Sequence, residues 1–597
     1  FLDFRNKFMK KVLIANRGEI AIRIARTCSD LGIKTVGIYS EDDANCLHLS
    51  KVDEAYPIQG KGAQAYLDIK QIISIAKESK ADFIHPGYGF LSENSALAAS
   101  AKRAKIKFIG PSEKTLKIFG DKTTAKELAL SLDIPTISGT HQKTSLKQAQ
   151  NFMKSLNKNS SILIKAISGG GGRGMRVVSK LEELKEPYDR ASSEAKAAFD
   201  SPDLYLEEYL ENYRHIEFQI IGDGTGAVSH LHERECSIQR RHQKLIEIAP
   251  SPSLGPELKN KMIDASMALA KKLKYEGLAT IEFLVNVEKN DFRFIECNPR
   301  LQVEHTVTES VLFIDIVKAQ IQIASGKTLK QIKLEQKNIP DPKGYAVQSR
   351  VNMETIDSKG NANPSGGIFT KFDLPSGPGV RVDSYGYVGY ETSPLFDSLI
   401  AKIITYSSED NFKQAIKRNY RSLCEFKIDG VTTNLDLLKN ILINQDFKNN
   451  KVHTNFFENN LETLISVKTH SDLSDISRSI IAKDKPKKGK IENLDPLAVL
   501  DHGKSGGMFV DQSENILELQ QEEIREGYRS ITAPMQGMIV KFDVEIGDSV
   551  WEGKTLGIME AMKMEHEIIS EVSGIVEDIS VSSLSLIHIS EPTRPLY

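Results

Sequence analysis

The sequence predicts a multidomain α/β protein that ends in a small all-β module. Near the start, a buried strand (10–17), a helix with amphipathic spacing and a second strand (34–42) form a βαβ unit. Near the other end, residues 532–559 and 568–581 alternate apolar and polar side chains between glycine turns. At 597 residues, the chain has room for about four domains.

The composition is that of an ordinary folded protein and excludes several function classes. The net charge is −2 with both signs mixed, which argues against a nucleic-acid partner. The five cysteines are scattered and form no CxxC pair, so we expect a reducing compartment: the cytoplasm, with the mitochondrial matrix as the alternative. No apolar run approaches the roughly 18 residues that span a bilayer, so no membrane partner is expected. We expect translation to begin at Met9, with a transit-peptide remnant as the alternative for the residues before it.

A glycine-rich loop predicts an anion site. The strand that ends at Lys165 leads into four consecutive glycines, Gly169 to Gly172. Glycines add no packing and carry maximal chain entropy, so their benefit is exposed backbone N–H groups that close over an anion. The loop has neither the GK[ST] of a Walker A motif nor the GxGxxG spacing of a dinucleotide site.

Two strands predict a metal site. Residues 279–287 and 292–305 alternate on either side of a polar turn, so Glu296 and Asn298 project from one face, and one plausible register sets Glu282 opposite Glu296. We expect no cation beside them on that face, and the carboxylates would then repel each other unless a metal lies between them. Mg²⁺ prefers oxygen ligands, so Glu282, Glu296 and Asn298 are the predicted ligands.

A basic cluster predicts a second anion-binding patch. Within eleven residues the chain carries Arg234, Arg240, Arg241, His242 and Lys244. Arginine forks and lysine point charges suit carboxylate-like anions and phosphates. Further on, residues 309–326 are expected to form one amphipathic helix.

Three stretches carry a family resemblance. Ala561-Met562-Lys563-Met564, at an expected hairpin tip, resembles the biotinyl carrier domain of biotin-dependent carboxylases. ANRGEIA and HPGYGFLSEN resemble the opening of biotin carboxylase, and the strand lysine with its glycine loop resembles the ATP-grasp fold. The resemblance implies a Rossmann-like pre-ATP-grasp domain (9–121), an ATP-grasp domain (122–330), a biotin carboxylase C-terminal domain (340–457), a linker (465–525), a carrier (528–582) and an atypical tail (583–597).

The resemblance also implies roles for individual residues. Nucleotide contacts are expected from Lys122, Lys165, Gly171, Gly172, His215, Gln239, His242 and the hinge at Glu207, Glu208, Tyr209 and Leu210. Bicarbonate is expected at Lys244, Arg300, Gln302 and the backbone of Val303, with Gln239 nearby. Glu304 is the expected general base, ionised because nearby arginines lower its pKa. Arg350 is expected to contact the biotin ureido oxygen.

These features predict an ATP- and bicarbonate-dependent ligase that carboxylates biotin, the first half-reaction of an acyl-CoA-type carboxylase. Its expected cofactors are ATP, Mg²⁺ or Mn²⁺, and biotin on Lys563. Its expected partners are bicarbonate, a carboxyltransferase subunit or domain, biotin protein ligase, and further copies of the chain in a homodimer or larger complex.

Three alternatives remain: a carbamoyl-phosphate-type ATP-grasp ligase, part of a longer single-chain carboxylase, and a non-catalytic scaffold. The carboxyl acceptor stays open among acetyl-CoA, propionyl-CoA, methylcrotonyl-CoA and pyruvate. In the tail, no glycine follows the second half-repeat of the carrier and two prolines interrupt it, so we expect a carrier without its last strands and with an open sheet edge.

Overall fold

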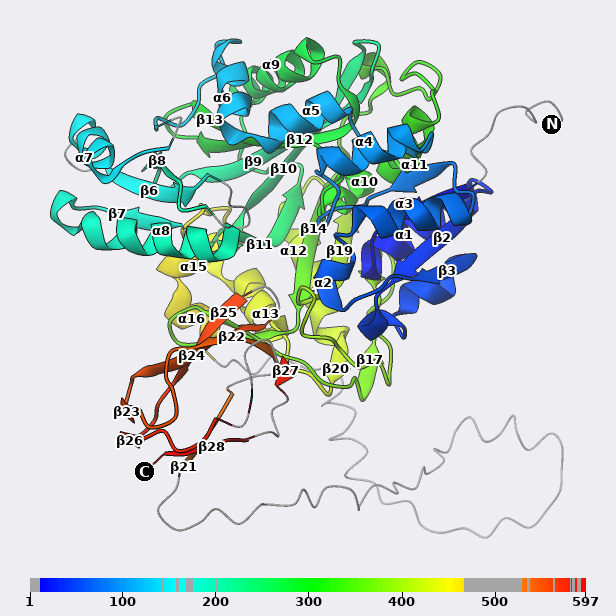
Figure 1. Cartoon of the computed structure of the whole chain (residues 1–597). Coiled ribbons are helices and arrows are strands. Elements are labelled where there is room, and N and C mark those ends of the chain that lie inside the picture. Colours follow the sequence, from blue (N-terminus) through cyan, green and yellow to red (C-terminus); the bar gives the residue numbers. More distant parts are fainter. Residues whose placement is uncertain are drawn as a thin grey trace, which may run out of the picture. The chain divides into compact units, whose positions relative to one another are not determined.

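The computed structural model describes residues 11–140, 143–156, 160–167, 175–199 and 201–466, and towards the C-terminus 529–533, 537–561, 564–579, 581, 586–587 and 592–596. They belong to two compact parts, which are described separately (Figure 1). Among these residues, no helix combines the length and the apolar character needed to cross a membrane.

The larger part begins with a five-stranded parallel sheet in the order β3-β2-β1-β4-β5. Its strands are β1 (Lys11–Ile14), β2 (Lys34–Tyr39), β3 (Glu54–Pro57), β4 (Phe83–His85) and β5 (Lys107–Phe108), connected through α1 (Gly18–Asp30), α2 (Gly62–Ala65), α3 (Ile69–Glu78) and α4 (Ser95–Arg103), and followed by α5 (Glu113–Gly120). This is the predicted Rossmann-like opening, and apolar residues of its strands are buried between the connecting segments.

A three-stranded antiparallel sheet follows, in the order β7-β6-β8. It contains β6 (Ser161–Ala166), β7 (Arg176–Val178) and β8 (Leu204–Tyr209), with α6 (Lys122–Leu130), α7 (Leu146–Ser155) and α8 (Lys185–Phe199) as the helices of this region. The glycine loop lies between β6 and β7 in the sequence, and its residues 168–174 lie outside the described residues.

The centre of the larger part is an eight-stranded sheet in the order β13-β12-β9-β10-β11-β14-β19-β18. Its strands are β9 (Arg214–Asp223), β10 (Val228–Arg240), β11 (Gln243–Ala249), β12 (Glu276–Asn286), β13 (Asp291–Asn298), β14 (Tyr345–Asn352), β18 (Val380–Ser384) and β19 (Leu399–Ser407). Every neighbouring pair is antiparallel. The sheet runs without a break from the predicted ATP-grasp segment into the predicted C-terminal segment, because β11 pairs with β14.

The remaining elements of the larger part cover this sheet or extend from it (Figure 1). The helices are α9 (Pro256–Lys272), α10 (His305–Leu312), α11 (Ile316–Ala324), α12 (Phe412–Glu425), α13 (Leu435–Ile443), α14 (Gln445–Lys448), α15 (Phe456–Asn459) and α16 (Leu461–Ile465). Two small ribbons pair β15 (Glu354–Ile356) with β16 (Ala362–Pro364) and β17 (Lys371–Asp373) with β20 (Lys427–Asp429). One hydrophobic cluster contains Val12, Val307 and Ile404, so the opening sheet shares a core with the large one.

The single helix expected over residues 309–326 is wrong, because the chain forms two helices there. Helix α10 ends at Leu312, and Phe313 adopts a left-handed φ of 57°. Asp315 then caps α11, its carboxylate accepting a hydrogen bond from the backbone N–H of Lys318 at 2.8 Å. Both helices are apolar on their buried side, so the helical spacing of apolar residues continues across the break. For that reason the sequence pattern does not reveal the break.

The smaller part is all β, as predicted. It contains β21 (Arg529–Thr532), β22 (Gly537–Phe542), β23 (Ser549–Val550), β24 (Thr555–Ala561), β25 (Met564–Ile569), β26 (Gly574–Ile575), β27 (Leu586–Ile587) and β28 (Pro592–Leu596). Four of them form a sheet in the order β25-β24-β22-β27, over a core that includes Ile539, Met559 and Ile568. The expected loss of the last strands is corrected in part, because β27 pairs with β22 and β28 pairs with β21.

Two glycines with left-handed backbone test how tightly β14 is held. Gly344 has φ 63°, and a Cβ there would lie 1.9 Å from the carbonyl oxygen of Ser407, the residue paired with Tyr345 on β19. Gly326 has φ 93° but faces open space. Gly344→Ala should therefore cost about 4 kcal/mol or more of folding free energy, because strain and a backbone clash combine. Gly326→Ala should cost about 1–2 kcal/mol, from strain alone.

Thermal and urea unfolding of the two variants beside the unchanged chain measures both costs. Equal losses at the two positions would contradict the close approach of Gly344 to β19.

Candidate functional site

The candidate site is built around Lys244 on β11. Its ammonium nitrogen lies 2.6 Å from a carboxylate oxygen of Glu217 on β9, 3.0 Å from Glu282 on β12 and 2.7 Å from Glu304 just before α10. All three carboxylates are buried, and Glu304 is fully enclosed. Three buried anions are thus held together by one cation, and the strands of the large sheet position most of them.

The charges decide the protonation states. Burial alone would raise the pKa of Glu304, but Lys244, Arg350 and Arg234 outweigh it and hold that pKa well below its usual range. Burial would likewise raise the pKa of Glu282, and Lys244 and His215 lower it. Burial would lower the pKa of Lys244, yet the surrounding carboxylates raise it well above its usual value. Glu282, Glu304 and Lys244 are therefore ionised at neutral pH.

Arg350 on β14 adds a second cation to Glu304. Its guanidinium donates to Glu304 at 3.0 Å and to Glu247 on β11 at 2.5 Å. Glu247 is fully buried, and the side chain of Gln348 donates to its other oxygen at 2.9 Å. Because Glu247 binds the guanidinium and is itself held by Gln348, Arg350 is presented at a defined place beside Glu304.

The predicted metal ligands lie together. The register pairs Glu282 with Glu296, as expected, and the amide nitrogen of Asn298 donates to Glu282 at 2.8 Å. The expectation that no cation lies beside them is wrong: Lys244 contacts Glu282, and Lys122 lies 3.8 Å from Glu296. These lysines come from other elements, which the spacing along one hairpin does not reveal.

The donor set still suits a hard divalent cation. Carboxylate oxygens from two adjacent strands, with the carboxamide oxygen of Asn298 next to them, are the ligand types that Mg²⁺ prefers. The side chain of Glu296 is 36% exposed and its only ion pair among the described residues is the long one to Lys122, so this carboxylate has room to take a cation.

The loop before Glu304 carries the expected bicarbonate residues. Arg300 donates to Glu93 at 2.7 Å, to Gln302 at 3.0 Å and to Asn298 at 3.3 Å. The carbonyl oxygen of Val303 accepts from the fully buried Lys402 at 3.1 Å. Arg300, Gln302 and Val303 thus lie within one hydrogen-bonded loop that leads into Glu304.

The basic cluster is not one patch. Arg234 is fully buried, and its donors are used by Glu217, Gln219, Thr280 and Thr308. Arg240 is buried 3.6 Å from Glu354. Arg241 and His242 form the exposed turn between β10 and β11, with φ of 46° and 64°. Arg234 and Lys244 both contact carboxylates of the site, whereas Arg240 pairs with Glu354. The prediction of one shared anion-binding patch is therefore wrong for Arg234 and Arg240, whose charges are already paired.

The expected nucleotide residues form two groups. His215 lies 2.8 Å from Glu282 and 2.7 Å from the amide nitrogen of Gln239, so both join the Lys244 site. Lys165 on β6 contacts Glu207 on β8 at 2.5 Å. The chain follows β8 from Glu207 through Glu208 to its end at Tyr209, and Leu210 comes next. The backbone N–H of Glu208 donates to the carbonyl oxygen of Ser138 at 2.8 Å. Gly171, Gly172 and Lys563 lie outside the described residues.

The hairpin tip expected around Lys563 also falls on residues 562–563, outside the described residues. The described strands on either side of it, β24 and β25, are neighbours in their sheet.

Glu217 is the main site residue that sequence reasoning missed. It is fully buried on β9 and contacts both Lys244 and Arg234. A signal was present: His215, Glu217 and Gln219 recur at every second residue of an otherwise apolar strand, which puts three polar side chains on one face. Such a stripe inside a core requires partners from other strands.

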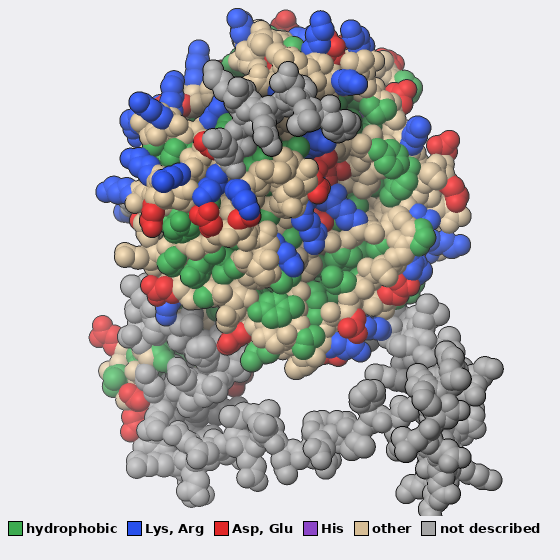
Figure 2. All heavy atoms as spheres, turned by 90° about the vertical axis from the view of Figure 1, so that its right-hand side faces the viewer, with side chains coloured by type: hydrophobic (Ala, Val, Ile, Leu, Met, Phe, Trp, Pro, Cys, Tyr) green, Lys and Arg blue, Asp and Glu red, His purple; other side chains and the backbone are tan. Residues whose placement is uncertain are grey.

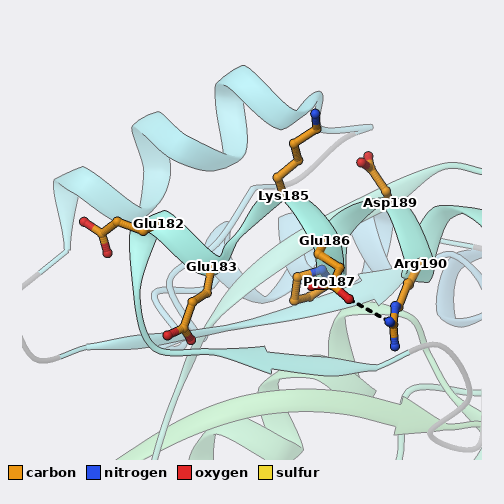
Figure 3. A pocket seen from close by; sticks show the side chains of 7 residues that line it. All are labelled: Glu182, Glu183, Lys185, Glu186, Pro187, Asp189 and Arg190. Carbon is orange, nitrogen blue, oxygen red and sulfur yellow. Dashed lines mark ion pairs between the residues drawn. The ribbon is translucent and has the colours of Figure 1, made fainter.

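Two surface features of the described residues do not resemble an enclosed ligand site. On the face in Figure 2, Lys and Arg side chains are interspersed with Asp and Glu. Figure 3 shows a depression at the start of α8 whose lining is mostly charged: Glu182, Glu183, Lys185, Glu186, Pro187, Asp189 and Arg190. This depression is open to solvent and contains one ion pair, Glu186 to Arg190 at 2.6 Å, so it does not enclose a ligand.

Four known families match successive parts of the chain. Residues 8–116 match the biotin carboxylase N-terminal domain, 121–332 the ATP-binding domain of the carbamoyl-phosphate synthase L chain, 348–459 the biotin carboxylase C-terminal domain, and 529–592 a family described as biotin-requiring enzyme. The last match reaches beyond residue 582, where the predicted carrier ends.

Individual proteins agree with this order. The chain is 46% identical over 459 residues to pyruvate carboxylase of Bacillus subtilis, covering 75% of this chain and 39% of that protein. It is 44% identical over 451 residues to one of the pyruvate carboxylase subunits of Methanothermobacter thermautotrophicus, covering 75% of this chain and 89% of that protein. The chain thus spans about two fifths of the length of the longer relative.

A solved structure extends the similarity to three dimensions. The biotin carboxylase domain dimer of the Hydrogenobacter thermophilus 2-oxoglutarate carboxylase, in complex with MgADP, ADP and bicarbonate, has a TM-score of 0.73 at 41% identity. The match covers 78% of this chain and all of that chain (100%).

Removing the central cation should make stability depend on pH in a specific direction. In Lys244→Met, burial is no longer offset, so the folded-state pKa values of Glu282 and Glu304 rise above those of the unfolded chain. Folding then takes up protons, and the stability deficit grows as the pH rises. We expect a loss of about 3–5 kcal/mol at pH 8 and a smaller loss at pH 5.

Urea unfolding between pH 5 and 8 measures this deficit. Lys117→Met, which removes an exposed pair with Glu113 on α5, is the matched control and should change stability by at most about 0.5 kcal/mol. A Lys244→Met deficit that is the same at both pH values would mean that the lysine contributes packing and no net charge compensation.

Proposed function

The chain belongs to the biotin carboxylase family of biotin-dependent carboxylases, and on that premise we propose that it carboxylates biotin on its own carrier module with ATP and bicarbonate. The observation that carries the proposal is Glu304: a fully buried, ionised carboxylate held between Lys244 and Arg350. A carboxylate kept ionised without water is poised to accept a proton from a substrate bound against the same two cations.

The larger part binds the substrates. Lys122, Lys165, His242 and the loop containing Gly171 and Gly172 hold the phosphates of ATP, and the hinge from Glu207 to Leu210 holds the adenine. Glu282, Glu296 and Asn298 hold Mg²⁺ or Mn²⁺, which neutralises phosphate charge when bound.

Bicarbonate lies against Lys244, Arg300, Gln302 and the backbone of Val303. These groups neutralise its charge and orient its oxygen towards the γ-phosphoryl group, so the transfer step depends chiefly on positioning. Glu304 takes the bicarbonate proton as the oxygen attacks the γ-phosphorus. ADP leaves, and the carboxyphosphate formed breaks down to CO2 and phosphate. Arg350, fixed by Glu247, offers a guanidinium N–H to the ureido oxygen of biotin. Biotin on Lys563 would supply the nitrogen that receives CO2, and the proton of that nitrogen would pass to the released phosphate or to a base of the enzyme.

The acceptor and the partners rest on weaker support. The sequence alone left the acceptor open among three acyl-CoA esters and pyruvate. The relatives are named as pyruvate and 2-oxoglutarate carboxylases, so we place pyruvate first among the candidates. A carboxyltransferase, on another subunit or on further sequence, makes the transfer. A homodimer is proposed from the dimer of the Hydrogenobacter relative. Five free cysteines support a reducing compartment such as the cytoplasm or mitochondrial matrix.

A carbamoyl-phosphate-type ligase is the second candidate, because residues 121–332 match the ATP-binding domain of that synthase. The biotin-requiring module at 529–592 favours biotin as the acceptor. The two candidates differ in whether free biotin stimulates turnover.

Bicarbonate-dependent ADP release with free biotin tests the proposal. The unchanged chain should release ADP faster when biotin is added. Glu304→Gln should lose roughly 10²- to 10⁴-fold of that rate, the usual contribution of a general base. Glu296→Gln should raise the Mg²⁺ concentration needed for activity. Glu257→Gln, on the surface of α9, is the control and should keep the full rate.

Other outcomes would redirect the assignment. Bicarbonate-dependent turnover that ignores biotin would favour the second candidate. Absence of ADP release under all conditions would favour a non-catalytic scaffold, and full activity of Glu304→Gln would remove that residue from the chemistry.

A further inference from the structure

One buried carboxylate in the larger part is shared by two lysines. Glu207 on β8 contacts Lys126 on α6 through one oxygen and Lys165 on β6 through the other, the latter at 2.5 Å. The Lys126 side chain is 5% exposed and that of Glu207 4%, while Lys165 is 13% exposed. The two lysines approach from different elements, so the group is a bridge of two positive charges and one negative charge.

The carboxylate of the bridge is held ionised. Burial alone would raise the pKa of Glu207, but Lys165 and Lys126 outweigh it and hold the pKa at about 2. Burial lowers the pKa of Lys126 more than Glu207 raises it. A single lysine would be enough to neutralise Glu207. Burying the second ammonium costs free energy, and this cost is not required for the neutralisation of Glu207.

Only one of the two lysines can reach a ligand. Lys165 ends the strand that leads into the glycine loop, whereas Lys126 is enclosed among α6, β8 and the ring of Tyr205, 5.7 Å from its ammonium. Ala125 and Ala129 already provide the apolar contacts of α6 with the core. A nonpolar residue would therefore serve packing at position 126, and the ammonium there calls for an electrostatic role.

We propose that Lys126 is a positioning residue that keeps Glu207 neutralised when Lys165 turns to the phosphates of a bound nucleotide. Without Lys126, Lys165 would be the sole counter-charge of a buried carboxylate, and its movement towards a phosphate would leave Glu207 without a counter-charge. Because Lys126 neutralises Glu207, the charge of Lys165 is available to the phosphates. The inference rests on the proposed nucleotide role of Lys165 and adds a residue that no substrate touches.

Nucleotide affinity of the full chain tests the idea directly, by calorimetric titration with MgADP in the absence of bicarbonate and biotin. Lys126→Met should weaken binding about tenfold and raise the KM for ATP similarly, with the KM for bicarbonate within twofold. Lys126→Arg, which keeps the charge, should bind within threefold of the unchanged chain. The double variant Lys126→Met/Glu207→Gln removes the buried anion together with its partner and should bind MgADP more tightly than Lys126→Met does. Lys117→Met is the surface control.

The double variant decides the matter even if Lys126→Met folds poorly, since it removes the fully buried carboxylate that Lys126→Met leaves with one counter-charge fewer. If the double variant binds MgADP as weakly as Lys126→Met, the proposal is overturned and the loss is assigned to packing. Unchanged affinity in Lys126→Met would also overturn the proposal. MgADP binding needs no turnover, so a chain that binds nucleotide but fails to carboxylate biotin would refute the proposed function and still test Lys126.

Discussion

The ammonium of Lys244 touches carboxylates from β9, β12 and the segment before α10, and each of these would repel the others without it. Taking four charged groups out of water is costly, and it is compensated only where every group has a close partner. The large sheet provides this, since neighbouring strands fix the spacing of the side chains along it. Arg350 and Arg234 then complete the charge balance around Glu304 and Glu217. The site thus depends on the sheet, and the sheet's polar interior is stable only because the site is balanced.

Features that arise within one hairpin could be predicted from the sequence. Alternation and a short polar turn made Glu282 opposite Glu296 one of the plausible registers, and this register is confirmed. The all-β end and the opening βαβ unit follow from periodicity in the same way. The biotin carboxylase resemblance, carried by a few motifs, is confirmed by the matched families and relatives.

Features that depend on contacts between distant segments could not be predicted from the sequence. Arg234 was predicted to bind an anion, but in the structure its N–H groups donate to Glu217 and Thr308. Lys126 gives no sign of its role, because its partner lies 81 positions away. The break at Phe313 was hidden because apolar spacing continues on both sides of it. In each case the sequence shows the residue but does not show which residue lies next to it in the folded chain, and that neighbour decides its role.

The pairing of β11 with β14 bears on how the protein can be dissected. A fragment that stopped near residue 330 would contain an apparently whole ATP-grasp region, yet it would lack the strand that carries Arg350. It would also bare the edge of β11, where Leu245 to Ala249 are buried apolar residues apart from Glu247. Exposed apolar strand edges pair with other chains and aggregate. The two regions are therefore best treated as one cooperative folding unit, whatever their separate ancestry.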